Sequence, residues 1–511
     1  MRKNVKGAAS RFYPGSHIAK HREWRGLKDT WYDYTQWIKI LGVMGGFVAK
    51  APVRIMKGML EYRWFGSYLG GLHMIDMNTE GFRGIPLRVA REEFNAIMRV
   101  STTQLADMMK ADRRFGDNKY ADKIVLLEQA MSPELLGGFP NLKGLCLETY
   151  MGLIVCMMDQ SVNPHYIDAM EGLGLPADSC RLSANAAGVA VCDDFPLIGA
   201  CAISNNAPCD SSVMNSQLIE RRLTVPTMPA EIPMRWEDRD TDEYALAHIK
   251  KVISFIEEHT GEKFDGNAFL KAMENHNQEV RNELERFEIF RTPYLGTSAP
   301  LTMIYHMFFY TFSGGLRPEI LETDKKVKKL LEKAYAERIN SFPKARYRAV
   351  LWGGDAIYYT SLLNWLYNCW GVLPVVTMGA LAGNTIIDTS SLDRALIDVA
   401  KNFERGIMRR HLTGGYEHLL ECFDSVEQFN ADFLILNDDI TCKGALGLTG
   451  VIYETAAKKD IPVMTVSNDM FDHRTVTRQD MRKQASDFMY SVMNAAPLDE
   501  SLLNFDDFEG W

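Results

Sequence analysis

Three cysteines occupy positions where a metal centre or a redox group could be held. Cys180 lies in the proline-containing turn LPADSC, which follows a helix-like segment. Cys209 and Cys442 each follow a strand-like apolar run and a polar loop, and each precedes a helical pattern. The N-terminus of a helix lowers the pKa of a thiol, and metals bind the thiolate. From spacing alone, metal binding by these three residues and an incidental position in loops both stay open.

The other six cysteines are better explained by packing. A free cysteine inside an apolar run or a helical pattern behaves as a small buried hydrophobe. The six are Cys146, Cys156, Cys192, Cys201, Cys369 and Cys422, and the role of Cys192, before Asp193, is the least defined. An odd total of nine, spread over a long chain, indicates reduced thiols and a cytoplasmic protein rather than a secreted disulfide framework.

Several common cofactor motifs are missing from the sequence. It contains no G-x-x-x-x-G-K-[ST] phosphate loop, no H-E-x-x-H zinc helix and no C-x-x-C pair. The segment Gly172-Leu173-Gly174 runs into Pro176, which spoils a dinucleotide-binding fingerprint. Nucleotide hydrolysis and nicotinamide binding by this chain are therefore disfavoured.

Strand-like runs alternate with helical patterns in two parts of the chain, which predicts βαβ units and parallel sheets. In the first part, FPLIGACA and LTVPTMP flank a helix-like stretch over 210–222. The second part contains RAVLWGG, LPVVTMG, ADFLILN and IPVMTVSN, each ending in Gly or Asn. Such endings are typical of buried parallel strands that lead into functional loops. We expect an α/β fold with two doubly wound, flavodoxin-like lobes.

The remaining segments are mostly helical. Apolar residues at helical spacing after Thr241 end at Gly261, a candidate C-cap. The N-terminal part mixes aromatic and basic residues without alternation of period two, and is expected to wrap on the core or on a partner. We divide the chain into an N-terminal helical or irregular extension (1–140), a first lobe (141–240), a helical bridge (241–345), a second lobe (346–495) and an acidic tail (496–511).

The charge and hydropathy of the chain limit its partners. The 57 Lys and Arg residues against 66 Asp and Glu residues give a formal net charge of −9, which argues against nucleic-acid binding. The longest apolar stretch, 37–49, is too short for a membrane span and contains Lys39. The basic N-terminus lacks the apolar region of a secretory signal. The basic run from Lys50 to Lys57 could lie on an anionic membrane surface, but a solvated or docked helix face explains it better.

Several segments, taken together and in order, resemble the 2-hydroxyacyl-CoA dehydratase and benzoyl-CoA reductase family. The similarity runs from about residue 160 to about residue 495, and the first 140 residues carry none of it. The segments are PHYIDAMEGLGLPADSC, FPLIGACAISNNAPCD, TVPTMPAEIP, HIKKVISFIEEHTGEKFD, ADFLILNDDITCKG and IPVMTVSNDMFDHR.

The resemblance implies a [4Fe-4S] cluster held by three cysteines, which match Cys180, Cys209 and Cys442 in this sequence. With two ligands from the first lobe and one from the second, the cluster would lie between the lobes. Three cysteines leave one iron open as a Lewis acid. A thioester carbonyl on that iron could accept one electron as a ketyl radical, which makes loss of an α-hydroxyl group and a β-proton feasible.

Two features near the candidate ligands each allow two interpretations. Lys443 either stabilises the charge of the adjacent ligand or is a solvated residue of a first helical turn. The element Asp469, Asp472, His473 and Arg474 is similar to a D-x-x-D-x-R element of the family, and its simpler interpretation is a salt-linked loop that supports the lobe. No pattern marks the acyl group that is bound or the groups that move protons.

The leading hypothesis is an iron-sulfur subunit of a radical 2-hydroxyacyl-CoA dehydratase, which converts a 2-hydroxyacyl-CoA to an enoyl-CoA. The alternatives are a benzoyl-CoA reductase subunit with ATP-dependent ring reduction and a non-catalytic relay or scaffold subunit. The expected partners are the acyl-CoA substrate, a homologous second subunit and a separate ATP-hydrolysing iron-sulfur activator. The phosphates of coenzyme A require a local basic site, for which the candidates are Arg409-Arg410-His411 and Arg221-Arg222.

Overall fold

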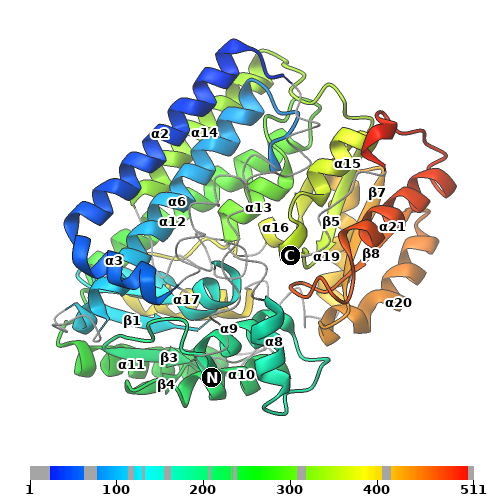
Figure 1. The fold of residues 1–511 in the computed structure, drawn as a ribbon. Coiled ribbons are helices and arrows are strands. Elements are labelled where there is room, and N and C mark those ends of the chain that lie inside the picture. Colours follow the sequence, from blue (N-terminus) through cyan, green and yellow to red (C-terminus); the bar gives the residue numbers. More distant parts are fainter. Residues whose placement is uncertain are drawn as a thin grey trace.

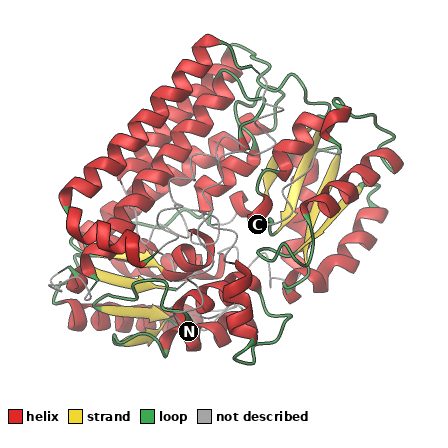
Figure 2. Ribbon diagram, viewed as in Figure 1, coloured by secondary structure: helices red, strands yellow, loops and turns green. Residues whose placement is uncertain are grey.

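The protein consists of a layer of long helices and two lobes, each built around a parallel β-sheet (Figures 1 and 2). The structure is a computed structural model. It describes residues 24–62, 78–112, 120–128, 133–154, 163–204, 209–231, 233, 239–307, 318–381, 383–405 and 416–503.

The first sheet has the strand order β2-β1-β3-β4, with every pair parallel. Its strands are β1 (Ile124–Leu127), β2 (Lys143–Cys146), β3 (Cys201–Ser204) and β4 (Thr227–Pro229). Strand β1 lies inside the sheet although it precedes residue 140, in the segment assigned from sequence to the N-terminal extension. The first sheet therefore begins earlier in the chain than expected. The strand was not predicted because its four-residue run, IVLL, is too short to show the period of two that is typical of strands.

The second sheet repeats this topology as β6-β5-β7-β8. Its strands are β5 (Tyr347–Gly353), β6 (Val372–Thr377), β7 (Phe433–Asp439) and β8 (Val463–Asn468). The order in both sheets is that of the first four strands of the flavodoxin-like fold. Two doubly wound α/β lobes and a helical N-terminal region are thus confirmed.

Helices cover both faces of the two sheets. In the first lobe these are α8 (Asn163–Glu171), α9 (Arg181–Val191), α10 (Asp210–Glu220) and α11 (Arg239–Thr260). The second lobe has α15 (Leu362–Trp370), α16 (Met378–Leu381), α19 (Tyr416–Gln428), α20 (Lys443–Lys458) and α21 (Arg478–Ser491). Helix α17 (Leu392–Arg405) lies between β6 and β7 in sequence, yet its apolar face packs with α11 over the first sheet. The connection after β6 therefore crosses from the second lobe to the first.

The helical layer lies beside both lobes (Figure 1). It comprises α2 (Leu27–Lys50), α3 (Pro52–Glu61), α6 (Ile85–Ala111), α12 (Gly266–Phe290), α13 (Ala299–Met307) and α14 (Pro318–Ala336). Helix α6 is buried over most of its length between α2, α13 and α14. Gly261 has a φ of 71° and directly follows the last residue of α11, as the sequence predicts for a C-cap.

Short helical turns join these elements. They are η4 (Ala121–Lys123), η5 (Pro133–Gly138), the π-helical η6 (Thr149–Ile154), η9 (Ile357–Tyr359) and η10 (Glu500–Leu502). The strand-like run FPLIGACA forms a strand only from Cys201 onward, since Pro196 lacks a backbone donor. Within the described part of the chain, no helix is both long enough and apolar enough to cross a membrane.

A buried ionic network joins four helices of the layer around Arg286 of α12. The guanidinium lies 3.1 Å from Glu283, 3.4 Å from Glu93 of α6 and 3.8 Å from Asp324 of α14. Tyr305 of α13 donates a hydrogen bond to Asp324 at 2.8 Å. Burial raises the pKa of Glu93 to about 8 and that of Asp324 to about 6. One guanidinium therefore faces more carboxyl groups than it can neutralise, so part of the network holds protons near neutral pH.

The first prediction concerns Glu93 and pH. Its pKa is higher in the folded chain than in the unfolded chain, so its stabilising contribution is complete below the unfolded value near 4.5 and is lost as the pH rises through about 8. Glu93→Gln should flatten the fall in unfolding free energy over this range, by an amount on the order of a few kcal/mol. Urea unfolding at a series of pH values measures it. Glu92→Gln, on the more exposed side of α6, is the control that should keep the wild-type slope; equal slopes for all three proteins would contradict the prediction.

Candidate functional site

Each of the three cysteines predicted as ligands is the N-cap residue of a helix. Cys180 caps α9, Cys209 caps α10 and Cys442 caps α20. The sequence expectation that a helix begins directly after Cys209 and after Cys442 is met, and the structure adds a third helix that begins directly after Cys180. Three helix N-termini therefore present their positive dipole ends and backbone N–H groups to sulfur atoms.

The topology places two of these cysteines at equivalent points of the two lobes. Cys209 follows β3 and Cys442 follows β7, the third strands of their sheets. In each sheet this strand pairs with the first strand, at the point where the strand order reverses. Ligands of open α/β sheets bind at this reversal, outside the carboxyl ends of the strands.

Specific contacts bring Cys180 to the other two cysteines. Its backbone N–H donates a hydrogen bond to Ser211, in the first turn of α10, at 2.9 Å. On the other side, Lys443 in the first turn of α20 forms an ion pair with Asp178 at 3.4 Å. The segment that ends at Cys180 therefore contacts the first turn of each helix that the other two cysteines cap.

The thiols are close enough for their charges to interact. Burial raises the pKa of Cys180 well above its usual range, and the charges of Asp439, Cys442 and Cys209 raise it further. Burial also raises the pKa of Cys442 to about 11; the backbone N–H of Ala445 opposes the rise, while Asp439 and Cys209 add to it. The structure thus brings Cys180, Cys209 and Cys442 together at the boundary between the lobes.

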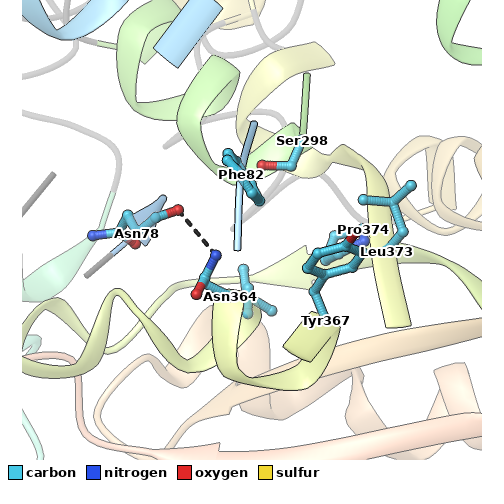
Figure 3. A pocket seen from close by; sticks show the side chains of 8 residues that line it. Asn78, Phe82, Ser298, Asn364, Tyr367, Leu373 and Pro374 are labelled. Atoms are coloured by element: carbon cyan, nitrogen blue, oxygen red, sulfur yellow. Dashed lines mark hydrogen bonds between the residues drawn. The ribbon is translucent and has the colours of Figure 1, made fainter. Parts of the chain in front are cut away.

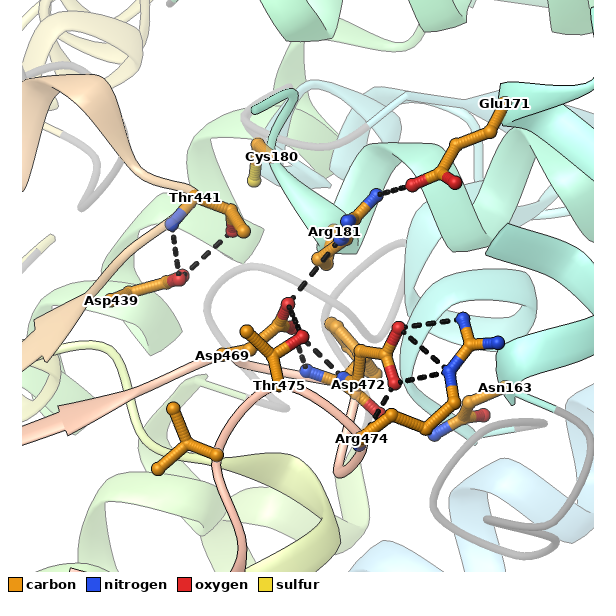
Figure 4. A network of polar contacts seen from close by, with 12 residues as sticks. Asn163, Glu171, Cys180, Arg181, Asp439, Thr441, Asp469, Asp472, Arg474 and Thr475 are labelled. Carbon is orange, nitrogen blue, oxygen red and sulfur yellow. Dashed lines mark hydrogen bonds and ion pairs between the residues drawn. The ribbon is translucent and has the colours of Figure 1, made fainter. Parts of the chain in front are cut away.

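Asp439 is a buried carboxyl group beside these thiols, at the end of β7. Its Oδ1 atom accepts hydrogen bonds from the backbone N–H of Thr441 at 3.0 Å and from the Thr441 hydroxyl at 2.9 Å. Figure 4 shows Cys180 opposite Asp439 and Thr441. Burial raises the pKa of Asp439 to about 6. The charge of this carboxylate disfavours a thiolate at Cys180, so thiolates need a positive charge nearby.

A buried ion pair fixes the position of Cys180 between the lobes. Arg181, the next residue, donates from Nε to Asp469 of the second lobe at 3.4 Å and from a terminal nitrogen to Glu171 of the first lobe at 3.0 Å (Figure 4). Asp469 has no exposed surface, and its Oδ1 accepts hydrogen bonds from the backbone of Phe471 and Asp472 at 3.0 and 2.9 Å. The loop after β8 and the start of α9 are therefore held together.

Arg474 makes a second, more exposed connection between the lobes. It lies 2.7 Å from Asp472 on its own loop and 3.0 Å from Asp168 of α8. Asn163 of the first lobe donates a hydrogen bond to the backbone carbonyl of Phe471 at 3.3 Å. The predicted salt-linked loop is thus present, and it links the two lobes in addition to supporting its own.

Most of the chain matches one known protein family. A sequence profile described as 2-hydroxyglutaryl-CoA dehydratase, D-component, matches residues 148–490, well over half of the chain. The chain belongs to the 2-hydroxyglutaryl-CoA dehydratase D-component family. The resemblance noted from sequence is confirmed, and the family name describes a component of a dehydratase, which implies a partner component. No curated protein sequence gives a significant match to the chain.

The region matched to the dehydratase D-component family holds all three cysteines and the whole Arg181 network. It begins after β2, so it excludes β1, β2 and the helices α2, α3 and α6. Two of the four strands of the first sheet and much of the helical layer are therefore supplied by sequence outside the match.

The two candidate sites for the phosphates of coenzyme A have different outcomes. Arg221 and Arg222 follow the last residue of α10, whereas Cys209 caps the first. An 11-residue helix is about 16 Å long, so these arginines lie well away from the cysteines. The segment 409–411 lies outside the described residues.

The other described cysteines occupy the packed positions expected of them. Cys146 and Cys201 are buried in strands, and Cys369 and Cys422 are buried in helices. Cys192 follows α9 at its far end, and its sulfur lies 3.6 Å from the Nε2 atom of His165. It is therefore separated from Cys180 by the length of that helix. Cys156 lies outside the described residues.

Asp355 is a polar residue at the second sheet that the sequence analysis did not single out. It follows β5, and Asn437 at the end of β7 donates a hydrogen bond to it at 2.5 Å. Gly353, with a φ of 101°, allows the close approach of the two strand ends, since a Cβ atom there would meet the carbonyl oxygen of Asn437. Burial raises the pKa of Asp355 to about 7, which suits a group that gains and loses a proton. The only sequence signal was its place after a Gly-Gly strand end.

A small cavity lies at the opposite edge of the second sheet and does not belong to this site. It is lined by residues of α15, the start of β6 and the segment 78–82, and Asn364 donates a hydrogen bond to the backbone of Asn78 at 3.2 Å (Figure 3). It has room for about one water molecule. Leu373 and Pro374, which line it, begin β6, whereas Cys442 follows the carboxyl end of β7.

The second prediction concerns the ion pair that joins the lobes. Arg181→Met should leave the buried Asp469 carboxylate without its guanidinium partner and lower the unfolding free energy by about 3–5 kcal/mol. Urea denaturation measures the loss, and limited proteolysis should show faster cleavage. Lys483→Met removes an exposed pair with Asp487 and should change neither measurement. If Arg181→Met were as stable as the wild type, the pair would not hold the lobes together.

Proposed function

We propose that this chain is the cluster-bearing subunit of a radical 2-hydroxyacyl-CoA dehydratase, with Cys180, Cys209 and Cys442 as ligands of a [4Fe-4S] cluster. The reaction removes water from a 2-hydroxyacyl-CoA to give an enoyl-CoA. The observation that carries the proposal is the convergence of three cysteine-capped helix N-termini at the boundary of the lobes.

The donor set suits a cluster better than a single ion. Among the described residues, no three His, Cys, Asp or Glu side chains are placed to bind one metal ion together. In a cluster each cysteine binds a different iron, so the sulfur atoms need not share one coordination sphere. A set of three thiolates would leave one iron of such a cluster open to a substrate oxygen.

The chain's own residues would prepare this site in three ways. The N-terminal N–H groups of α9, α10 and α20 point toward the sulfurs and stabilise negative charge there. Arg181 holds Cys180 against the second lobe through Asp469. Burial raises the pKa of Cys180 and Cys442 and so favours their protonated forms, and cluster binding is therefore expected to release protons from them. A bound cluster supplies the Lewis-acidic iron and the single electron that elimination from a 2-hydroxyacyl thioester requires.

The proposal includes further components. A homologous second subunit fits the D-component description, and a separate ATP-hydrolysing activator fits the lack of a phosphate loop in this sequence. We assign Asp355 as a candidate for proton transfer, because it lies at the carboxyl edge of the same sheet as Cys442 and titrates near neutral pH.

The third prediction tests the ligands. Anaerobically purified wild-type chain should contain about four irons and four sulfides per chain. Cys209→Ser should lose most of the iron, because a hydroxyl group is a poor iron ligand in such clusters. Cys192→Ser is the matched control, since Cys192 lies at the other end of α9, and it should keep the wild-type iron content. Unchanged iron in Cys209→Ser, or equal loss in both variants, would overturn the assignment.

The fourth prediction tests whether the open iron meets substrate. Electron paramagnetic resonance of the reduced wild-type chain should change when a 2-hydroxyacyl-CoA is added and should not change with free coenzyme A. A full iron content with a spectrum that no thioester alters would point to a relay or scaffold subunit. Steady consumption of ATP and electrons with every turnover would instead indicate a reductase of the benzoyl-CoA type.

A further inference from the structure

Helix α2 exposes large apolar side chains on its outer face. Its inner face packs on the layer through both polar and apolar groups. Asp33 is buried and pairs with Arg25 at 3.2 Å and with Arg91, whereas Ile40 is buried in the hydrophobic core. Figure 1 shows the helix at the outer margin of the helical layer. The exposed fractions are 81% for Leu27, 72% for Trp31, 64% for Tyr34, 68% for Ile38 and 48% for Leu41.

A contiguous apolar face of this size is typical of an interaction surface. We call the outer face, residues 27, 31, 34, 38, 41 and 45, the α2 seam. The steps along it alternate between four and three residues, which is the heptad spacing of a coiled coil. This spacing suits another helix that lies nearly parallel or antiparallel along the full length of α2, about 36 Å.

The α2 seam changes size along its length. Its N-terminal half carries Leu27, Trp31 and Tyr34, whereas Gly45 lies in its C-terminal half. A Cβ atom built on Gly45, or on the neighbouring Gly42 and Gly46, would meet no atom within 4 Å. We therefore expect the partner helix to place large side chains opposite the glycine end of α2 and smaller side chains opposite the end with Trp31.

We propose that the α2 seam is an interface between two copies of this chain, in which the two α2 helices pack antiparallel about a two-fold axis. The same helix, reversed, places the small Gly45 opposite Leu27 at the bulky end of the seam. In an antiparallel coiled coil, an a position of one helix lies opposite a d position of the other. In this register Leu27 lies opposite Gly45 of the second copy, Trp31 opposite Leu41 and Tyr34 opposite Ile38. Each layer occurs twice, as an isologous interface demands. Antiparallel helix dipoles also attract each other.

Other occupants fit the α2 seam less well. Residues 1–23 contain six Lys or Arg residues, and Pro14 limits an uninterrupted helix before it to 13 residues, roughly 20 Å. A membrane surface would accept the apolar and aromatic side chains, but a flat bilayer gives no reason for heptad spacing or for a glycine end. The seam also lies outside the region matched to the dehydratase family, so this contact is separate from the proposed activity.

The association state of the full-length chain tests this interface. Light scattering coupled to size-exclusion chromatography, over a concentration series, should show a dimer of the wild-type chain without any other protein. Ile38→Glu places a carboxylate in both central layers and should raise the dissociation constant by about 100-fold or more. Because Ile38 is exposed, the fold of the monomer should be unchanged in circular dichroism. Leu173→Glu, an exposed apolar residue outside the seam, is the matched control and should remain dimeric.

Disulfide trapping tests the antiparallel register. A mixture of Leu27→Cys and Gly45→Cys chains should form a disulfide between positions 27 and 45, identified by peptide mapping, and neither variant alone should form one at these positions. A link between two copies of position 27 would show parallel packing and overturn the register. A monomer at every concentration would overturn the interface, as would a chain that floats with anionic vesicles through the seam without dimerising. A dimer in which Ile38→Glu and Leu173→Glu behave alike would place the contact elsewhere.

Discussion

The ion pair between Arg181 and Asp469 is the contact on which the geometry of the proposed site depends. The two residues are 288 positions apart, and both are almost without exposed surface. A charged group at such depth is stable only with its partner in place. Because Arg181 directly follows Cys180, the pair sets the distance between this cysteine and the loops after β7 and β8. Any relative movement of the lobes would separate two buried charges, so the arrangement of the cysteines is held by electrostatics as well as by packing.

The electrostatics of the same region explain why the cysteines have little tendency to ionise alone. Burial and the carboxylate of Asp439 disfavour the thiolates of Cys180 and Cys442, while the helix N-termini favour them only partly. A bound cation would reverse this balance, because a coordinated thiol loses its proton. Burial also raises the pKa of the packed cysteines Cys146 and Cys201, so the interaction of Cys180 with Cys209 and Cys442, and not the rise itself, distinguishes the proposed site.

The helical layer is unusual in the placement of its charged and apolar side chains. Arg286 and its carboxyl partners are buried between α6, α12 and α14, and Asp33 is buried between α2 and α6. Several large apolar side chains of α2, among them Trp31 and Ile38, meanwhile face outward. A helix that buries ion pairs and exposes tryptophan has a favourable position only if its outer face is covered. The layer therefore supports both the site, by packing against the lobes, and an association of the chain that the family match does not cover.

Local sequence patterns were sufficient for most elements of the two lobes. The runs RAVLWGG and ADFLILN became β5 and β7 to within two residues at either end, and a helix follows Cys209 and Cys442 as predicted, because apolar spacing and turn residues act over a few positions. The choice of Cys180, Cys209 and Cys442 as ligands came from the family resemblance and stays a prediction. The tertiary structure alone decided the rest. It placed β1 in the first sheet, carried α17 across to that sheet, paired Arg181 with Asp469 and set Asp355 against Asn437. These four arrangements depend on which residues, far apart in the sequence, are buried together. Such contacts produce no periodic pattern in the sequence, so local patterns cannot predict them.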